Sequence, residues 1–164
     1  MVFLSVLVSD TNIWIDIENG GILIEVFKLP YKFVIPDLAT AELKRPGWET
    51  LVVLGLEVQE LIGKQTLELV QLRQQHKALS IIDFAAFLLA KSLDATLLTG
   101  ESQLNKLATE NQISVHGVLW LLDEMVMFQV LTPGQAAKAL RRMLVQGARL
   151  PEEECSKRLA MWSG

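Results

Sequence analysis

Short apolar runs alternate with longer amphipathic stretches along this chain of 164 residues. The first run, Phe3–Ser9, ends at a polar cluster, as a strand buried on both faces of a sheet does. Apolar runs separated by helical stretches are typical of a parallel α/β fold, because parallel strands need a crossover connection between them. We expect strands at Phe3–Ser9, Lys32–Ile35, Leu56–Glu60, Ala95–Thr99 and Ile113–Val115.

The helical stretches differ in how much of their surface is apolar. Ile81–Leu93 is apolar nearly all round, which predicts a helix at the centre of the core, whereas the polar stretch Lys64–Gln75 predicts an exposed helix. Thr132 and Pro133 have the residue types of an N-cap and a first helical position, and predict a basic helix that runs to about Val145. Further helices are expected at 11–19, 21–29, 37–44, near residue 51, at 101–111, 117–128 and from residue 151 onward.

The size and hydropathy of the chain favour one domain without a membrane span. No apolar run approaches the roughly 18 residues that a spanning helix needs, although the mean hydropathy is +0.32. The first residues have no basic region, and the single cysteine, Cys155, cannot form an internal disulfide. We therefore expect a cytoplasmic protein, with one domain at 1–130 and a helical C-terminal extension at 131–164 packed on it.

Charge is distributed unevenly along the chain. Residues 1–128 carry 9 Lys and Arg against 16 Asp and Glu, a net charge of −7, and residues 129–164 carry 6 against 3, a net charge of +3. A solvated helix face accounts for the basic segment. The alternative is that the acidic excess includes a metal-binding cluster and that the basic segment provides charge for a phosphate ligand nearby.

Acidic residues follow three of the expected strands. Asp10 follows the first strand, Glu42 lies in the helix expected after the second, and Glu101 follows Ala95–Thr99. Because the carboxyl ends of parallel strands meet at one edge of the sheet, these three carboxylates are delivered to the edge where ligands bind. A fourth acid, Asp83, opens the apolar helix at 81–93, where a buried carboxylate needs a cation or hydrogen-bond donors.

Three of these acids also have a purely structural explanation. Ser80 and Asp83 have the spacing of a capping box, and Asp10 and Glu101 suit the positive end of a helix dipole. Helix caps, however, have no reason to converge on one edge of a sheet. Four carboxylates gathered there would repel one another unless a divalent cation neutralised them, and carboxylate oxygens are the ligands that Mg²⁺ or Mn²⁺ prefers. The two histidines, at 76 and 116, stand alone, so the pattern does not resemble a zinc site.

These motifs resemble the PIN-domain ribonucleases, and among them the VapC-like toxins of prokaryotic toxin–antitoxin pairs. The similar features are Asp10-Thr11-Asn12 after the first strand, Glu42 further along, Ser80-x-x-Asp83 and Leu97-Leu98-Thr99-Gly100-Glu101. The resemblance covers roughly residues 4–128. The segments 113–122 and 149–151 are also similar to a subgroup that carries a C-terminal helical extension.

The resemblance implies a three-layer α/β/α fold with a central parallel sheet of four or five strands, and Mg²⁺- or Mn²⁺-dependent cleavage of RNA. It implies a catalytic set of Asp10, Glu42, Asp83 and Glu101, with Asp10, Asp83 and Glu101 as metal ligands. Asn12 and Thr99 would hold Asp10 and the metal-bound waters in place. The family usually has Asp where this chain has Glu101, and the additional methylene moves the carboxylate by about one carbon–carbon bond.

Partners follow partly from the residues and partly from the resemblance. Gly21–Leu29 and the apolar segment near Leu119 have more apolar surface than one small domain covers, which predicts a homodimer. The resemblance implies a small antitoxin protein that lies across the acidic groove. The alternative function is a weakly active or inactive PIN-fold module that binds RNA or a protein. Acid-pocket phosphatases require a second Asp at position 12, where this chain has Asn, and phosphotransfer receivers require a lysine that is not found at a matching place.

Overall fold

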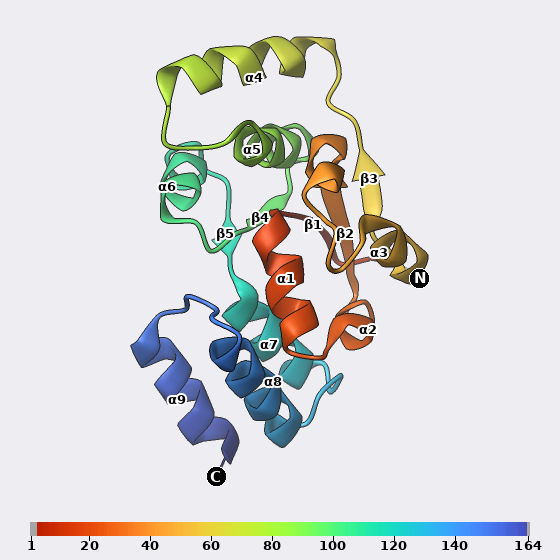
Figure 1. Ribbon diagram of the computed structural model, residues 1–164, viewed down its shortest axis with the longest axis vertical. Coiled ribbons are helices and arrows are strands. Elements are labelled where there is room, and N and C mark those ends of the chain that lie inside the picture. The colour runs from red at the N-terminus through yellow and green to blue at the C-terminus, as the bar shows by residue number, and fades with distance from the viewer. Residues whose placement is uncertain (1–2, 164) are drawn as a thin grey trace.

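The computed structural model describes residues 3–163, and within them the strands form a five-stranded sheet that is parallel throughout. The strand order is β3-β2-β1-β4-β5, and helices cover both faces (Figure 1). The fold is therefore the α/β fold that the alternation of apolar runs predicts. The strands are β1 (Ser5–Ser9), β2 (Tyr31–Pro36), β3 (Glu57–Gln59), β4 (Thr96–Leu98) and β5 (Val115–His116).

The helices divide between two apolar cores, one on each face of the sheet. One core includes residues of α1, α2, α3, α7, α8 and α9, and the other is built mainly from α4, α5 and α6. Figure 1 shows α4, α5 and α6 at one end of the molecule and α7, α8 and α9 at the other. The helices are α1 (Thr11–Asn19), α2 (Leu23–Val26), α3 (Trp48–Leu54), α4 (Gly63–Gln75), α5 (Ile81–Leu93), α6 (Ser102–Glu110), α7 (Val118–Met127), α8 (Pro133–Val145) and α9 (Glu152–Ser163), with a 3₁₀ helix, η1, at Asp37–Ala41.

Alternation along the strands assigns each side chain to one of the two cores. Leu7 packs in the core under α1, whereas its neighbour Val8 packs in the core under α5. An aromatic cluster anchors α1 in the first of these cores. Trp14 stacks on Phe27 with ring centroids 5.3 Å apart and meets Phe33 edge-on at 5.5 Å. Because α1 starts immediately after Asp10, this packing also positions the carboxylate at the end of β1.

Helix α5 is the buried helix that its composition predicts. Seven consecutive side chains, from Phe84 to Ala90, are buried. They lie between the sheet on one side and α4 and α6 on the others, so no face of the middle of the helix reaches solvent. Helix α8 begins at Pro133 with Thr132 as its N-cap and ends at Val145, also as predicted.

Several expected elements are shorter in the structure, and three of them differ in a way that bears on the site or the topology. The helix expected at 37–44 is a 3₁₀ helix that ends at Ala41, because Lys44 and Gly47 pair in a tight antiparallel bridge that turns the chain. Glu42 therefore follows a 3₁₀ helix and is not part of an α-helix. The helix expected at 21–29 is reduced to Leu23–Val26, since Gly21 has a φ of 72° that a helix excludes. The last strand is Val115–His116, further along than expected.

No helix within residues 3–163 combines the length and the hydrophobicity needed to cross a lipid bilayer.

Candidate active site at the carboxyl edge of the sheet

The carboxyl ends of β1 and β4 are adjacent, although they are far apart in the sequence. Strand order reverses here, because β2 and β3 extend the sheet to one side of β1 and β4 and β5 extend it to the other. The Asp10 amide donates to the Leu98 carbonyl at 3.0 Å, which places the first acid directly beside the end of β4. In open α/β sheets such a reversal leaves a crevice at the carboxyl edge, where ligands bind.

Asp10 is buried at this edge, with 5% of its surface exposed. Its Oδ1 accepts a hydrogen bond from the Ile13 amide at 3.2 Å, so Asp10 is the N-cap of α1, and its Oδ2 accepts one from the Thr99 hydroxyl. Burial raises the pKa of Asp10 to about 6, with a smaller raising contribution from the charge of Asp83, while the hydrogen bonds from Thr99 and Ile13 oppose the rise. The carboxylate therefore changes protonation state much nearer to neutral pH than an exposed aspartate does.

Thr99 connects Asp10 to the start of α6. It is 3% exposed, and its hydroxyl donates to Asp10 while accepting from the Glu101 amide at 3.0 Å. The position of Thr99 depends in turn on β5, since its amide donates to the His116 carbonyl at 3.0 Å. One hydroxyl thus couples the end of β1 to the loop that carries Glu101.

The Glu101 and Asp83 carboxylates each cap a helix. Oε2 of Glu101 accepts from the Leu104 amide at 2.6 Å, which makes Glu101 the N-cap of α6. Asp83 and Ser80 form the predicted capping box at the start of α5: Ser80 Oγ accepts from the Asp83 amide at 3.1 Å and Asp83 Oδ2 accepts from the Ser80 amide at 3.0 Å. Both side chains are half-buried at the same edge of the sheet.

Glu42 is exposed and joins this edge through a threonine. Its Oε2 accepts a hydrogen bond from the hydroxyl of Thr11, the first residue of α1, at 3.1 Å. Thr11 is 7% exposed, so its hydroxyl is held against the protein and is not surrounded by water. This contact links the segment after β2 to the helix that Asp10 caps.

The structure brings the four acids to one edge without gathering them around one point. The charge of Asp83 is near enough to contribute to the raised pKa of Asp10. Within residues 3–163, however, no group of three or more Asp, Glu, His or Cys side chains lies close enough together to ligate one metal ion. Asn12, expected beside Asp10, is exposed, and the two acceptor oxygens of Asp10 are instead occupied by Ile13 and Thr99.

Two residues at this edge do not figure among the sequence-based candidates. Thr11 is the donor to Glu42, and Asp16 of α1 is half-buried, with a pKa raised by burial. The charge of Asp16 contributes to the raised pKa of Asp10. A signal for Asp16 is present in the sequence, since it is the one charge in the apolar segment 13–17.

Both a family model and a solved structure are similar to this chain. The family model DUF3368, described as a PIN domain, matches residues 6–163. A search of curated proteins found no match. Among solved structures, a PilT N-terminus domain protein from the hyperthermophilic archaeon Sulfolobus solfataricus is similar, with a TM-score of 0.52 and 19% sequence identity over 72% of this chain and 91% of that chain. At this identity, the structural likeness concerns the fold alone.

Proposed function

Because the chain belongs to the PIN-domain family, we propose that it is a metal-dependent endoribonuclease resembling the VapC-like toxins. PIN domains are generally nucleases and typically use divalent metal ions. The observation that carries the proposal is the buried Asp10 at the reversal of strand order, coupled through Thr99 to Glu101 and lying near Asp83. We assign the nuclease to residues 1–130 and regard 131–164 as its helical extension.

The donors at this edge suit Mg²⁺ or Mn²⁺, which prefer carboxylate oxygens. We assign Asp10, Asp83 and Glu101 as metal ligands and Glu42 as the fourth acid of the catalytic set. Among the described residues, Glu42, Asp83 and Glu101 each use one carboxylate oxygen in a hydrogen bond, which leaves the other available. When bound, the cation supplies a water of lowered pKa and neutralises charge on the scissile phosphate.

The protein side chains determine whether that site can form. Thr99 holds Asp10 in one orientation, and a nearby positive charge would lower the pKa of Asp10 and favour the ionised form that a ligand must adopt. Asp83 and Glu101 must move closer to Asp10 to share an ion with it, each through the carboxylate oxygen that its helix cap leaves free. Asn12, exposed beside Asp10, is assigned to orient water or phosphate there.

The proposed partners follow from the same assignment. The acidic edge would attract a small antitoxin carrying a basic side chain. A homodimer is supported by Ile24 of α2, which is 61% exposed, whereas Leu119, expected to leave apolar surface uncovered, is buried within the fold. Cytoplasmic RNA is the proposed substrate.

A module that binds RNA or a protein without cleaving it is the second candidate. It is favoured by the fact that Asp10, Asp83 and Glu101 all serve as helix caps in the structure. The Glu at position 101, where the family usually has Asp, also favours the binding module.

Metal-dependent thermal stability tests whether these acids hold a cation. The melting temperature of the parent should rise with millimolar Mn²⁺ or Mg²⁺, and that rise should vanish in Asp10→Asn/Asp83→Asn, because the bound cation stabilises the folded state. The control variant is Glu49→Gln/Glu110→Gln, which removes the same charge from exposed positions.

RNA cleavage in the same samples completes the test. Cleavage that requires the metal and is lost in the double Asp variant supports the nuclease. A metal-dependent rise without cleavage of any RNA supports the binding module, and cleavage that survives in the double variant shows the acids to be wrongly assigned.

A further inference from the structure

An open groove of about 600 Å³ lies between α8 and the end of α1 that is remote from Asp10. Lys138, Arg141 and Arg142 line it from α8, and Glu18 lines it from α1. We call this surface the α8 groove. None of its residues belongs to the acidic edge described above.

The three cations lie on one face of α8. Positions 138, 141 and 142 recur at helical spacing, and all three side chains are exposed. The opposite face of the helix packs in the core through residues such as Leu140 and Met143. The cations are therefore presented to solvent by a helix whose position is determined by its buried face.

These cations have no carboxylate partner within residues 3–163. The salt bridges of that part of the chain involve Lys32, Lys157 and Arg158. Arg141 donates to the Ser163 hydroxyl at 2.7 Å, a neutral acceptor. The Arg142 guanidinium lies over Gly21, where a Cβ would come within 2.8 Å of Nη1, so the lack of a side chain at Gly21 leaves room for this arginine.

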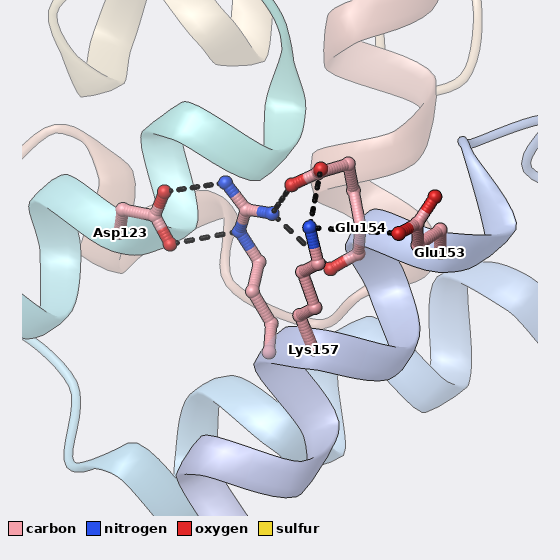
Figure 2. A network of polar contacts seen from close by, with 5 residues as sticks. Asp123, Glu153, Glu154 and Lys157 are labelled. Atoms are coloured by element: carbon pink, nitrogen blue, oxygen red, sulfur yellow. Dashed lines mark hydrogen bonds and ion pairs between the residues drawn. The ribbon is translucent and has the colours of Figure 1, made fainter.

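The basic residues of α9 behave differently. Figure 2 shows Lys157 between Glu153 and Glu154, at 3.7 and 3.6 Å, and Arg158 pairs with Glu154 at 3.0 Å and with Asp123 of α7 at 2.7 Å. Within the described residues, Lys157 and Arg158 of α9 are thus paired with carboxylates of α9 and α7, whereas the three cations of α8 have no such pairs. If these basic residues served only to solvate the C-terminal segment, there would be no reason for the cations of α8 and α9 to differ in this way.

We infer that the α8 groove binds the phosphate backbone of the RNA strand that the acidic edge cleaves, an inference that rests on the proposed function. Guanidinium groups present forked donors that match phosphate oxygens, and several cations along one helix suit a polyanion better than a single small anion. The nine residues of α1 separate the groove from Asp10 by about 14 Å, a distance that an RNA strand of a few nucleotides can span.

RNA binding in EDTA tests the groove apart from catalysis. The probe is a fluorescein-labelled RNA of about 20 nucleotides, and its anisotropy is measured at several salt concentrations with the parent and with Lys138→Gln/Arg141→Gln/Arg142→Gln. The dissociation constant of the triple variant should rise about tenfold or more. Its log–log salt slope should fall by about 2, because each phosphate that a cation neutralises contributes about 0.7 to the slope for a single strand.

Two further variants make the test specific. Lys64→Gln/Arg73→Gln/Lys77→Gln removes three exposed cations on and just after α4, at the opposite end of the molecule, and should bind as the parent does (Figure 1). Glu18→Gln removes the one carboxylate that lines the groove and should bind RNA more tightly.

The inference is overturned if the parent does not bind the long RNA, if both triple variants weaken binding equally, or if poly-glutamate competes as well as RNA at equal charge. If only the α8 variant loses RNA binding, the inference is supported, even where no RNA is cleaved. Failure of the nuclease assignment is therefore recognised separately, by the absence of cleavage. Equal melting temperatures of parent and variants exclude misfolding as the cause of any loss.

Discussion

Asp10 is a buried carboxylate whose neutral form the fold favours. Its pKa rises from the usual 3.8 to about 6 chiefly because burial removes water from the charged form. The folded state therefore binds a proton more tightly than the unfolded state between about pH 4 and pH 6. Stability that is present below this range is lost as the pH rises through it.

Replacing Asp10 by Asn should remove this pH dependence. In EDTA, we expect Asp10→Asn to gain up to about 3 kcal/mol in free energy of unfolding relative to the parent between pH 4 and pH 8, since the amide is never ionised. The measurement is urea unfolding across that range, with Glu110→Gln, an exposed acid, as the control. If the difference in free energy of unfolding between Asp10→Asn and the parent does not change with pH, the raised pKa of Asp10 is contradicted.

Thr99 and Thr11 each hold an acidic side chain in place at the carboxyl edge of the sheet. Each hydroxyl joins an acid to an element from another part of the chain, Thr99 to Asp10 and Thr11 to Glu42. Their residue types are visible in the sequence, but their partners are not. The partner of a hydroxyl depends on which strands lie side by side.

At the scale of elements, helix caps and candidate ligands are the same residues. The N-caps of α1 and α6 are Asp10 and Glu101, and Asp83 belongs to the capping box of α5. The sequence leaves two explanations open for these acids, a role as helix caps and a role as metal ligands, and the two roles are thus compatible. A carboxylate at a helix start is stabilised there by amides and by the helix dipole, and it also lies at the carboxyl edge.

The cap of α5 can be compared with an equivalent cap remote from the site. Ser80→Ala should lower the free energy of unfolding by about 1 kcal/mol, because the Asp83 amide loses its acceptor, and Thr132→Ala at the capping box of α8 should cost a similar amount. The two variants should differ in metal binding, since only Ser80→Ala disturbs the segment that carries Asp83. The melting temperature with and without Mn²⁺ measures this. If both variants reduce the Mn²⁺-dependent rise in melting temperature equally, Asp83 is not supported as a ligand.

At the scale of the whole molecule, the C-terminal helices share a core with the sheet. Leu140, Met143 and Trp162 belong to the same buried cluster as Leu7 and Trp14. Arg158 adds a polar link, with two hydrogen bonds to Asp123 of α7 at 2.7 and 2.9 Å and a side chain that is 18% exposed. Helix α9 is therefore attached to the fold by both packing and charge.

This attachment predicts unequal roles for neighbouring cations of α9. Arg158→Ala should lower the free energy of unfolding by about 1 to 3 kcal/mol, because it leaves Asp123 without its bidentate partner. Lys157→Ala should cost less than about 0.5 kcal/mol, since its ion pairs are exposed and longer. Urea unfolding of the two variants measures the difference. Equal losses would show that Arg158 acts as a surface charge only.

The α/β class, the extents of α1, α5 and α8, and the presence of four acids at one edge of the sheet could all be predicted from the amino-acid sequence. They follow from hydrophobic periodicity, capping residues and the geometry of parallel strands, all of which are local or general. The folded structure was needed to show that Thr99 bonds to Asp10, 89 residues away, and that Arg158 pairs with Asp123, 35 residues away. Such pairings depend on strand register and helix packing, which bring distant side chains together and are encoded by no single segment.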